Sequence, residues 1–191
     1  MDVFSTEEEL FKYIRDDVIY KYIKHDIEKR LENKEFWDYD WDKNKRIGSC
    51  PKHEIDISPT IQKLLRPYLK PKGISIVKES DEGIGDLDFK CIYNNNSEIM
   101  KVHIEYKNAH HEKLRKGLTT QLPAYMDADE AKYGIYLVFW FKDGINFDKP
   151  QNIESIDILQ EELDSEAEKI EDKIIEPIVI DVTKKKSASK R

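Results

Sequence analysis

Apolar residues recur every three or four positions near the start of the chain, from about residue 5 to 33. The members of this stripe are Leu10, Ile14, Val18, Ile23, Ile27 and Leu31. This spacing places side chains along one face of a helix, so we expect an amphipathic helix whose stripe packs on a core. A second helix is predicted to start at Ser58, which suits the N-cap, with Pro59 at the first helical position and an end before Gly73.

A different pattern, alternation of polar and apolar residues, marks two segments in the middle of the chain. Residues 85–90 (GDLDFK) and 102–107 (VHIEYK) both alternate with period two, and residues 94–97 (NNNS) between them have turn chemistry. We therefore expect an antiparallel hairpin. A turn centred on Asn95 and Asn96 would set Asp88 opposite His103, with Glu105 as a diagonal neighbour of Asp88 about 5–8 Å away.

The remaining pattern completes an α/β (α+β) fold. It predicts a strand at 73–78, a helix at about 111–127, a buried strand at 133–141, an amphipathic helix with apolar residues from Ile158 to Ile174, and a last strand at 177–182. We expect one domain over 1–183, with a central mixed sheet of about four to five strands flanked by helices. Its parts are a helical region (1–70), a sheet core (73–142), a C-terminal helix and strand (154–182), and then a basic tail (184–191).

The segment from Glu35 to Asp56 has no clear period. Trp37, Tyr39 and Trp41 alternate with aspartates, and residues 44–49 resemble a loop. Interleaved aromatic residues can stack on nucleobases, but such a cluster more often covers a core, and we expect the latter. For His53, Glu54 and Asp56 we expect a structural or surface role, because the first two would diverge on a strand.

Composition narrows the function classes. The 191 residues are 37% charged and 39% hydrophobic, which is typical of a globular chain. No run of about 18 apolar residues exists, so no membrane-spanning helix is expected. The N-terminus is acidic and lacks the apolar region of a signal peptide, which predicts a cytoplasmic protein. Cys50 and Cys91 offer neither a metal-site spacing nor a disulfide framework.

The net charge of −7 argues mildly against nucleic acid, but the charge is unevenly distributed. Residues 154–172 carry nine acids and one lysine, so the rest of the chain is close to neutral. Lys113, Arg115 and Lys116 form a local basic cluster that could contact phosphates.

The hairpin gathers charged residues on one face. Asp86, Asp88 and Lys90 share a face of the first strand, and His103, Glu105 and Lys107 share the matching face of the second. A solvated face of a one-sided strand would show the same pattern. The following helix favours a site instead, because Gln121 and Tyr125 lie four residues apart and so share a helical face.

This order of elements resembles the restriction-endonuclease-like PD-(D/E)XK nuclease superfamily. The elements are a strand with Gly-x-x-Asp, a strand with Glu-x-Lys, a helix with Gln-x-x-x-Tyr similar to the RecB-like branch, and a buried strand. The resemblance implies that Asp88 and Glu105 bind a metal ion, that Lys107 is the catalytic lysine, and that Gln121 and Tyr125 support the site. The family's Pro before the aspartate is absent here, which leaves Asp86 as an alternative ligand. Glu79 is the best-placed candidate for a further, upstream acid.

The resemblance also implies an activity. We expect a hydrolase that cleaves phosphodiester bonds with Mg²⁺ or Mn²⁺, an endonuclease or exonuclease acting on nucleic acid, with DNA as the expected substrate. Lys113, Arg115 and Lys116 would contact its phosphates. The alternatives are a catalytically inactive member of the fold that acts as a binding or assembly module in a larger nucleic-acid-processing complex, and an unrelated α+β domain. Whether the chain forms a homodimer or binds a partner subunit stays open.

Overall fold

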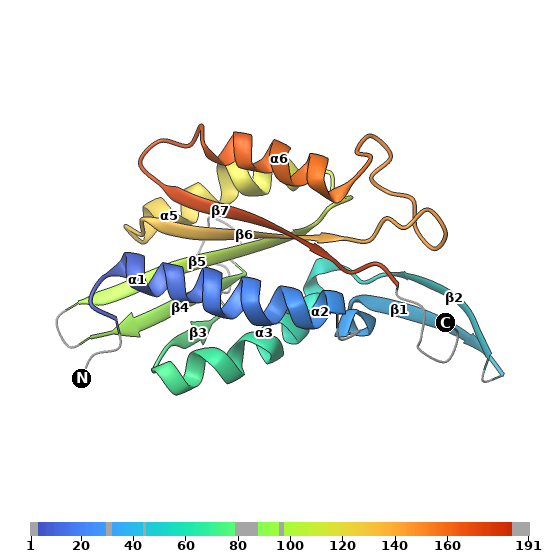
Figure 1. Ribbon diagram of the computed structural model, residues 1–191, viewed down its shortest axis with the longest axis horizontal. Helices are drawn as coiled ribbons and strands as arrows, with labels where there is room; N and C mark the ends of the chain where they lie inside the picture. Colours follow the sequence, from blue (N-terminus) through green and yellow to red (C-terminus); the bar gives the residue numbers. More distant parts are fainter. Residues whose placement is uncertain (1–3, 30–31, 44, 79–87, 96–97, 185–191) are drawn as a thin grey trace.

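The computed structural model describes residues 4–29, 32–43, 45–78, 88–95 and 98–184. A five-stranded mixed sheet lies at the centre, and helices cover both of its faces (Figure 1). The predicted fold class, a mixed sheet flanked by helices, is therefore confirmed. Each face of the sheet has its own hydrophobic core, one under the N-terminal helices and one under the helices of the second half of the chain.

The N-terminal helix runs along one face of the sheet without a break. It consists of α1 (Glu7–Lys12), the π-helical η1 (Tyr13–Lys24) and α2 (His25–Lys29). The described members of the predicted apolar stripe are all buried: Leu10, Ile14, Val18, Ile23 and Ile27. The stripe is thus explained by core packing, as helical spacing predicts.

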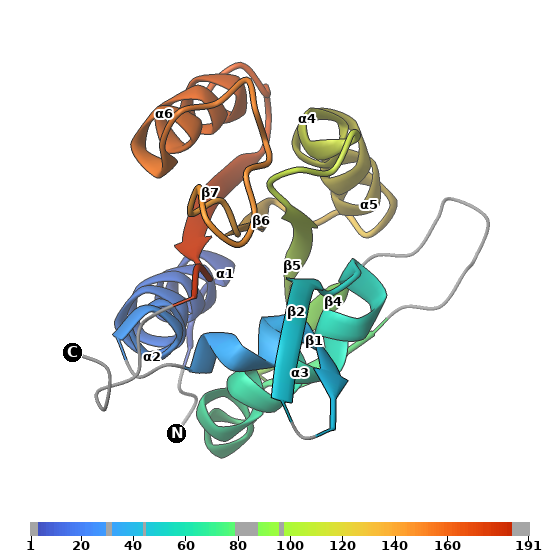
Figure 2. The ribbon, with the colours of Figure 1, turned by 90° about the vertical axis from the view of Figure 1, so that its right-hand side faces the viewer.

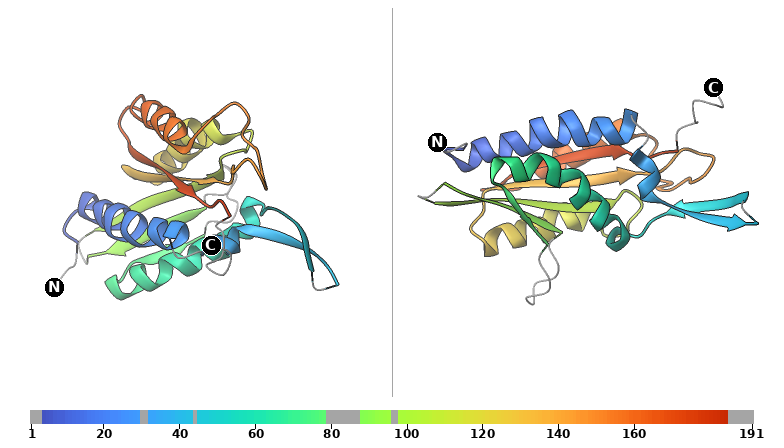
Figure 3. Two further views of the ribbon diagram at one scale, coloured as in Figure 1. Left: turned by 45° about the vertical axis from the view of Figure 1, so that its right-hand side comes forward. Right: turned by 90° about the horizontal axis from the view of Figure 1, so that it is seen from below.

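After the short helix η2 (Glu32–Phe36), the strands β1 (Trp37–Asp42) and β2 (Lys45–Pro51) form a separate antiparallel hairpin. It projects from the body of the molecule (Figures 2 and 3). The expected loop over 44–49 was wrong for residues 45–49, which belong to β2. Trp37 anchors the base of the hairpin, since its side chain is buried and its Nε1–H donates to the carbonyl of Val182 at 2.7 Å.

Helix α3 (Glu54–Leu69) begins five residues earlier than the sequence indicates, with His53 at the N-cap, so the prediction of Ser58 as its N-cap was wrong. The stripe Ile57, Ile61 and Leu65 is fully buried and repeats every four residues, which extends the helix back across Pro59. A proline in the second helical turn removes one backbone hydrogen bond, and burial of the stripe offsets this cost. Glu54 consequently lies in the first helical turn, not on a strand.

The sheet has the order β3-β4-β5-β6-β7. After α3 and η3 (Lys70–Lys72), its strands are β3 (Ser75–Val77), β4 (Phe89–Asn94), β5 (Ile99–Asn108), β6 (Tyr133–Trp140) and β7 (Ile174–Asp181). The first three are antiparallel neighbours, whereas β5, β6 and β7 run parallel. Every residue of β6 is buried, as its continuous apolar run predicts.

The predicted register of the central hairpin was wrong by two residues. His103 lies opposite Lys90, not Asp88, and Phe89 lies opposite Ile104. The reason is at the turn, where the amide of Glu98 donates to Oδ1 of Asn95 at 2.9 Å, so these two residues close the loop. A shift of two residues keeps every side chain on its face. It brings Asp88 level with Glu105 at the start of β4.

The second half of the chain supplies the helices of the other face. The predicted helix at 111–127 is α4 (Leu114–Lys116), the π-helical η4 (Gly117–Gln121) and α5 (Leu122–Ala128) in succession. Helix α6 (Ile156–Ala167) is shorter than its apolar pattern suggests, because Ile174 belongs to β7. In the part of the chain that the structure describes, no helix is both long and apolar enough to cross a membrane.

Candidate functional site

The polar face of the central hairpin is buried. His103 is fully buried and Glu105 is only 1% exposed, while Lys90 and Lys107 are also buried. The cause is the helical layer formed by α4, η4 and α5, which packs over this side of β5. The interpretation of these residues as a solvated strand face was therefore wrong. Charges in such a place need partners.

Glu105 and Lys107 form the centre of the cluster. They are two residues apart on β5, so they share a face, and Nζ of Lys107 donates to Oε1 of Glu105 at 2.7 Å. The second oxygen, Oε2 of Glu105, is buried and has no hydrogen-bond partner among the described residues. Burial raises the pKa of Glu105, although the neighbouring Lys107 and the backbone amide of Asp88 oppose this. An acceptor is thus left available inside the protein.

Asp88 brings a second carboxyl group to this centre from the start of β4. Its Oδ2 accepts the backbone amide of Tyr106 at 2.9 Å. Burial raises the pKa of Asp88 well above its ordinary value, and the charge of Glu105 raises it further; Lys107 and the Tyr106 amide act in the other direction. The half-buried carboxyl group of Asp88 and the buried carboxyl group of Glu105 therefore repel each other beside Lys107. The alternative ligand Asp86 and the upstream candidate Glu79 lie outside the described residues.

A third carboxylate comes from Glu54, which the sequence analysis assigned to a structural or surface role. Its Oε1 accepts the amide of Asn108, the last residue of β5, at 2.8 Å. Its Oε2 lies 3.7 Å from Nζ of Lys107 and 3.9 Å from Nε2 of His111. Glu54 is also among the charges that raise the pKa of Asp88. The signal that could have found it was the apolar stripe of α3, which carries the helix back to this residue.

The start of α3 is fixed to the end of β5 by further bonds. The hydroxyl of Tyr106 donates to the carbonyl of Glu54 at 3.0 Å, and Nδ2 of Asn108 donates to the carbonyl of Lys52 at 3.0 Å. The position of Glu54 is therefore set by backbone contacts and not by its side chain alone. His53 and Asp56, its companions in the sequence, are exposed.

Gln121 and Tyr125 lie in the helical layer over β5, as the sequence pattern indicates. Oε1 of Gln121 is buried without a hydrogen-bond partner among the described residues, and Tyr125 is buried in the second core. Among the residues that the structure describes, no hydrogen bond joins Gln121 to Glu105 or Lys107. The π-helical turn η4 ends at Gln121, just before Pro123, where a missing amide would interrupt an α-helix.

The close approach of this helical layer depends on Gly117 and Tyr136. Tyr136 lies beside Glu105 in the parallel pairing of β5 and β6, and its hydroxyl donates to the carbonyl of Leu114. A Cβ atom on Gly117 would lie 2.5 Å from the Tyr136 oxygen, so a larger residue would push the helix away. Burial, and then the charge of Glu105, raise the pKa of Tyr136, which keeps its hydroxyl neutral. No motif or periodic pattern in the sequence indicated a role for Gly117 or Tyr136.

The predicted phosphate-binding residues differ in their surroundings. Lys113 and Lys116 are exposed next to the cluster's helical layer. Arg115 is exposed too, but its guanidinium contacts Glu162 of α6 at 2.5 Å, so its charge is already compensated. The amide of Lys113 donates to Nδ1 of His111 at 3.0 Å, which leaves Nε2 of that ring directed to Glu54.

A second buried polar cluster lies along the same face. Oδ2 of Asp129, at the end of α5, contacts Nε2 of His103 at 2.7 Å and also Nζ of Lys90, and Oδ1 contacts Nζ of Lys101 at 3.2 Å. Burial raises the pKa of Asp129, but the hydrogen bonds from Lys90, His103 and Lys101 outweigh it and lower the pKa to about 2. This cluster fastens the helical layer to the hairpin. It explains the polar residue at position 103.

The donor set fits a hard divalent cation. Glu105 offers a buried, unpartnered carboxylate oxygen, and the carboxyl groups of Asp88 and Glu54 act on it electrostatically. Mg²⁺ and Mn²⁺ bind oxygen ligands, and Mg²⁺ typically uses only one or two carboxylates and retains water. Within the described ranges, no group of three or more His, Cys, Asp or Glu side chains is arranged as a ready enclosure for a metal. The described residues therefore fit a metal site in which the protein supplies only a few of the ligands.

Comparisons with known proteins place the chain in one family. The model of the family described as Domain of unknown function (DUF8371) matches residues 16–143, about two thirds of the chain. The chain belongs to this family. The matched segment contains α3, β4, β5 and the helical layer. It therefore includes the three carboxylates Glu54, Asp88 and Glu105. No curated protein and no solved structure matches the chain.

Proposed function

We propose that this DUF8371 protein is a metal-dependent nuclease of the PD-(D/E)XK type that hydrolyses phosphodiester bonds, with DNA as the expected substrate. The observation that carries the proposal is the unpartnered, buried Oε2 of Glu105, which lies in a cluster with Asp88 and Lys107. A protein gains nothing in stability by burying such a group without a partner. A site that binds a cation accounts for its presence.

Asp88 and Glu105 would hold Mg²⁺ or Mn²⁺, and Glu54 would complete the acidic side of the site. When bound, such an ion lowers the pKa of a coordinated water and compensates charge on a phosphate. The amide of Tyr106 keeps one oxygen of Asp88 oriented, which leaves the other for a ligand. The same ion would relieve the repulsion that now raises the pKa of Asp88.

Lys107 would act on the reacting phosphate. Burial lowers the pKa of its ammonium, but Glu105, Asp88 and Glu54 outweigh this and raise it, so the group stays protonated at neutral pH. A fixed positive charge in a buried site stabilises the extra negative charge of the transition state and can orient a water molecule. Once a cation takes part of the charge of Glu105, Nζ can turn to the phosphate.

The helical layer would position the substrate. Gln121 would orient Lys107 or the phosphate backbone through its buried, unpartnered oxygen or its amide, and Tyr125 would brace the layer from the core. Lys113 and Lys116 are exposed beside it and would contact phosphates. The acidic residues of α6 would repel nucleic acid, so the substrate should approach from the side of α3 and α4.

The proposal is tested by incubating the protein with plasmid, linear duplex, single-stranded DNA and RNA, with Mg²⁺ or Mn²⁺ and with a chelator. We expect cleavage of at least one substrate that requires the metal and is lost in Asp88→Asn. This substitution removes the charge and retains the shape, and melting curves would check the fold. Absence of cleavage on every substrate, with an intact fold, would contradict the proposal and favour the non-catalytic binding module.

A further inference from the structure

Strand β7 forms one edge of the central sheet. Side chains form hydrogen bonds with most of the backbone groups that face outward along this edge. The even-numbered Ile174 and Val182 donate their amides towards β6, to the carbonyls of Lys132 just before it and of Trp140 at its end. The odd-numbered residues of β7 therefore direct their backbone groups outward. The outward groups of β7 that have side-chain partners are the carbonyls of Pro177 and Val179 and the amides of Val179 and Asp181. Their partners are Gln160 of α6, Lys24 of η1 and Glu28 of α2.

These hydrogen bonds from side chains do not extend to Ile175. Pro177 has no amide to offer, and no hydrogen bond to the outward amide and carbonyl of Ile175 occurs among the described residues. An unpaired segment of an edge strand is a template for another extended chain. Its neighbour Ile174 is a large apolar side chain that is 44% exposed. A short open stretch thus remains at the beginning of β7.

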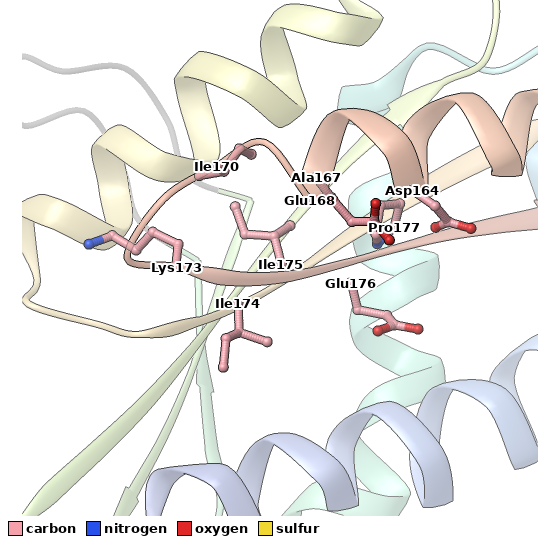
Figure 4. Close-up of a pocket in the computed structure, with 9 residues that line it drawn as sticks. All are labelled: Asp164, Ala167, Glu168, Ile170, Lys173, Ile174, Ile175, Glu176 and Pro177. Carbon is pink, nitrogen blue, oxygen red and sulfur yellow. The ribbon is translucent and has the colours of Figure 1, made fainter.

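A pocket of about 420 Å³ lies at this open stretch. Its walls combine isoleucines with three acids, Asp164, Glu168 and Glu176. Figure 4 shows Asp164 and Glu168 on the α6 side of β7 and Glu176 on the opposite side. The lysine at its border, Lys173, points away and contacts Oδ1 of Asp127 at 2.6 Å. Glu176 already contacts the guanidinium of Arg15 at 3.7 Å and accepts the hydroxyl of Tyr20 at 3.1 Å, so the acidic wall of the pocket is the α6 side, with Asp164 and Glu168.

An extended basic segment has the chemistry to fill this pocket. Its backbone could pair with the open edge at Ile175, which is the geometry of strand addition. Its successive side chains would point to opposite faces, so that every second one points towards Glu168 on the α6 side. A lysine at such a position matches the negative charge of Glu168. The exposed Ile174 would be covered at the same time.

The chain itself contains such a segment at 185–191, with the sequence KKSASKR, in which four of seven residues are cations. The chain cannot easily place this segment in its own pocket. Lys184 lies over the rings of Trp37 and Tyr39, at 4.5 and 5.3 Å from their centroids, beyond the end of β7 that is far from Ile175. The distance along the strand from Ile175 to Val182 is seven residue steps, or about 23 Å at about 3.3 Å per step. Lys185 and Lys186 therefore need a second copy.

We propose that the pocket at Ile175 binds the basic segment 185–191 of a second copy of this chain. The contact combines strand pairing at Ile175 with an ion pair to Glu168 from Lys185 or Lys186, whichever of the two points to the α6 side. Two copies can exchange segments reciprocally about a two-fold axis. The proposal does not depend on the nuclease activity, since the pocket lies at the edge strand that does not contain the carboxylate cluster.

Sedimentation velocity at low salt, without metal or nucleic acid, tests this proposal on the full chain. We expect association that rises with protein concentration and weakens with added salt. Glu168→Lys should weaken it at least about tenfold, as should the pair Lys185→Glu with Lys186→Glu, because each places like charges in contact. Combining the two changes in one chain should restore association. Glu161→Lys, an exposed residue of the same helix outside the pocket, is the matched control.

A fluorescent peptide of residues 183–191 provides a second measurement. It should bind to the full chain and lose most of its affinity in Glu168→Lys, whose exposed position leaves the fold intact. A chain that stays monomeric at every concentration would overturn the proposal, even if the peptide binds. Association that is indifferent to both charge reversals would also overturn it.

Discussion

Lys107→Met should remove nearly all of the proposed nuclease activity while metal binding persists. We expect the cleavage rate to fall by about 1,000-fold, which is the effect of removing one preorganised charge from a buried transition-state site. Methionine has a similar length and apolar stem, so packing is retained. The carboxyl groups of Asp88 and Glu105 stay in place, and a cation can still bind between them. Single-turnover cleavage and a parallel metal titration measure the two effects separately.

The variant also changes stability in a way that metal should reverse. Without Lys107, Glu105 loses its ion pair at 2.7 Å, so the metal-free protein should melt at a lower temperature. Divalent cation should restore part of this loss, because it supplies positive charge at the same point. Lys21→Met is a matched control, since Lys21 is exposed on η1, where its ammonium contacts Asp17 and the ring of Tyr22. Cleavage by Lys107→Met at a rate close to that of the wild type would remove Lys107 from the mechanism.

Asp129→Asn should produce the largest loss of stability among single substitutions of the polar residues. Its carboxylate contacts the buried Lys90 and His103 together with Lys101, and an amide removes this negative charge from all three contacts. Breaking a buried ion pair from one side typically costs about 3–5 kcal/mol. Denaturant unfolding measures this free energy. Asp127→Asn, two residues earlier and exposed, is the matched control and should change stability by less than about 0.5 kcal/mol.

In the wild type, the contribution of Asp129 should also appear in the pH dependence of the free energy of unfolding. The pKa of Asp129 is about 2 in the folded protein, below the value of about 3.9 in an unfolded chain. The stabilisation is therefore fully present above about pH 4 and is lost as pH falls towards 2, with a size of about 2 kcal/mol. Asp129→Asn should lack this part of the acid transition. An identical acid transition in both proteins would contradict the assigned role of Asp129.

Residue patterns in the sequence were sufficient to predict most of the helices and strands and part of the candidate site. The period-two alternation of β4 and β5 identified the face that carries Asp88, Glu105 and Lys107, because side-chain direction in a strand depends only on local spacing. The continuous apolar run of β6 indicated a strand buried on both faces. These signals are local, and tertiary packing did not change them.

The parts that the sequence did not predict depend on contacts between distant segments. Glu54 reaches the cluster because backbone bonds fix the start of α3 to the end of β5, more than fifty positions along the chain. The hairpin register depends on which asparagine closes the loop, and the three consecutive asparagines do not decide this. The burial of His103 follows from Asp129, which arrives with α5. No pattern within one element contains this information.

The central claim, that Asp88 and Glu105 form a cation site, is tested most directly by calorimetric titration of Mn²⁺ into the wild type and into Glu105→Gln. The amide retains the shape of Glu105 but removes the charge and the unpartnered carboxylate oxygen. We predict saturable binding of Mn²⁺ to the wild type and a loss of at least about tenfold in affinity in the variant, since a second carboxylate contributes strongly to binding of a hard cation. Equal affinity in both proteins, or no binding to the wild type, would contradict the account.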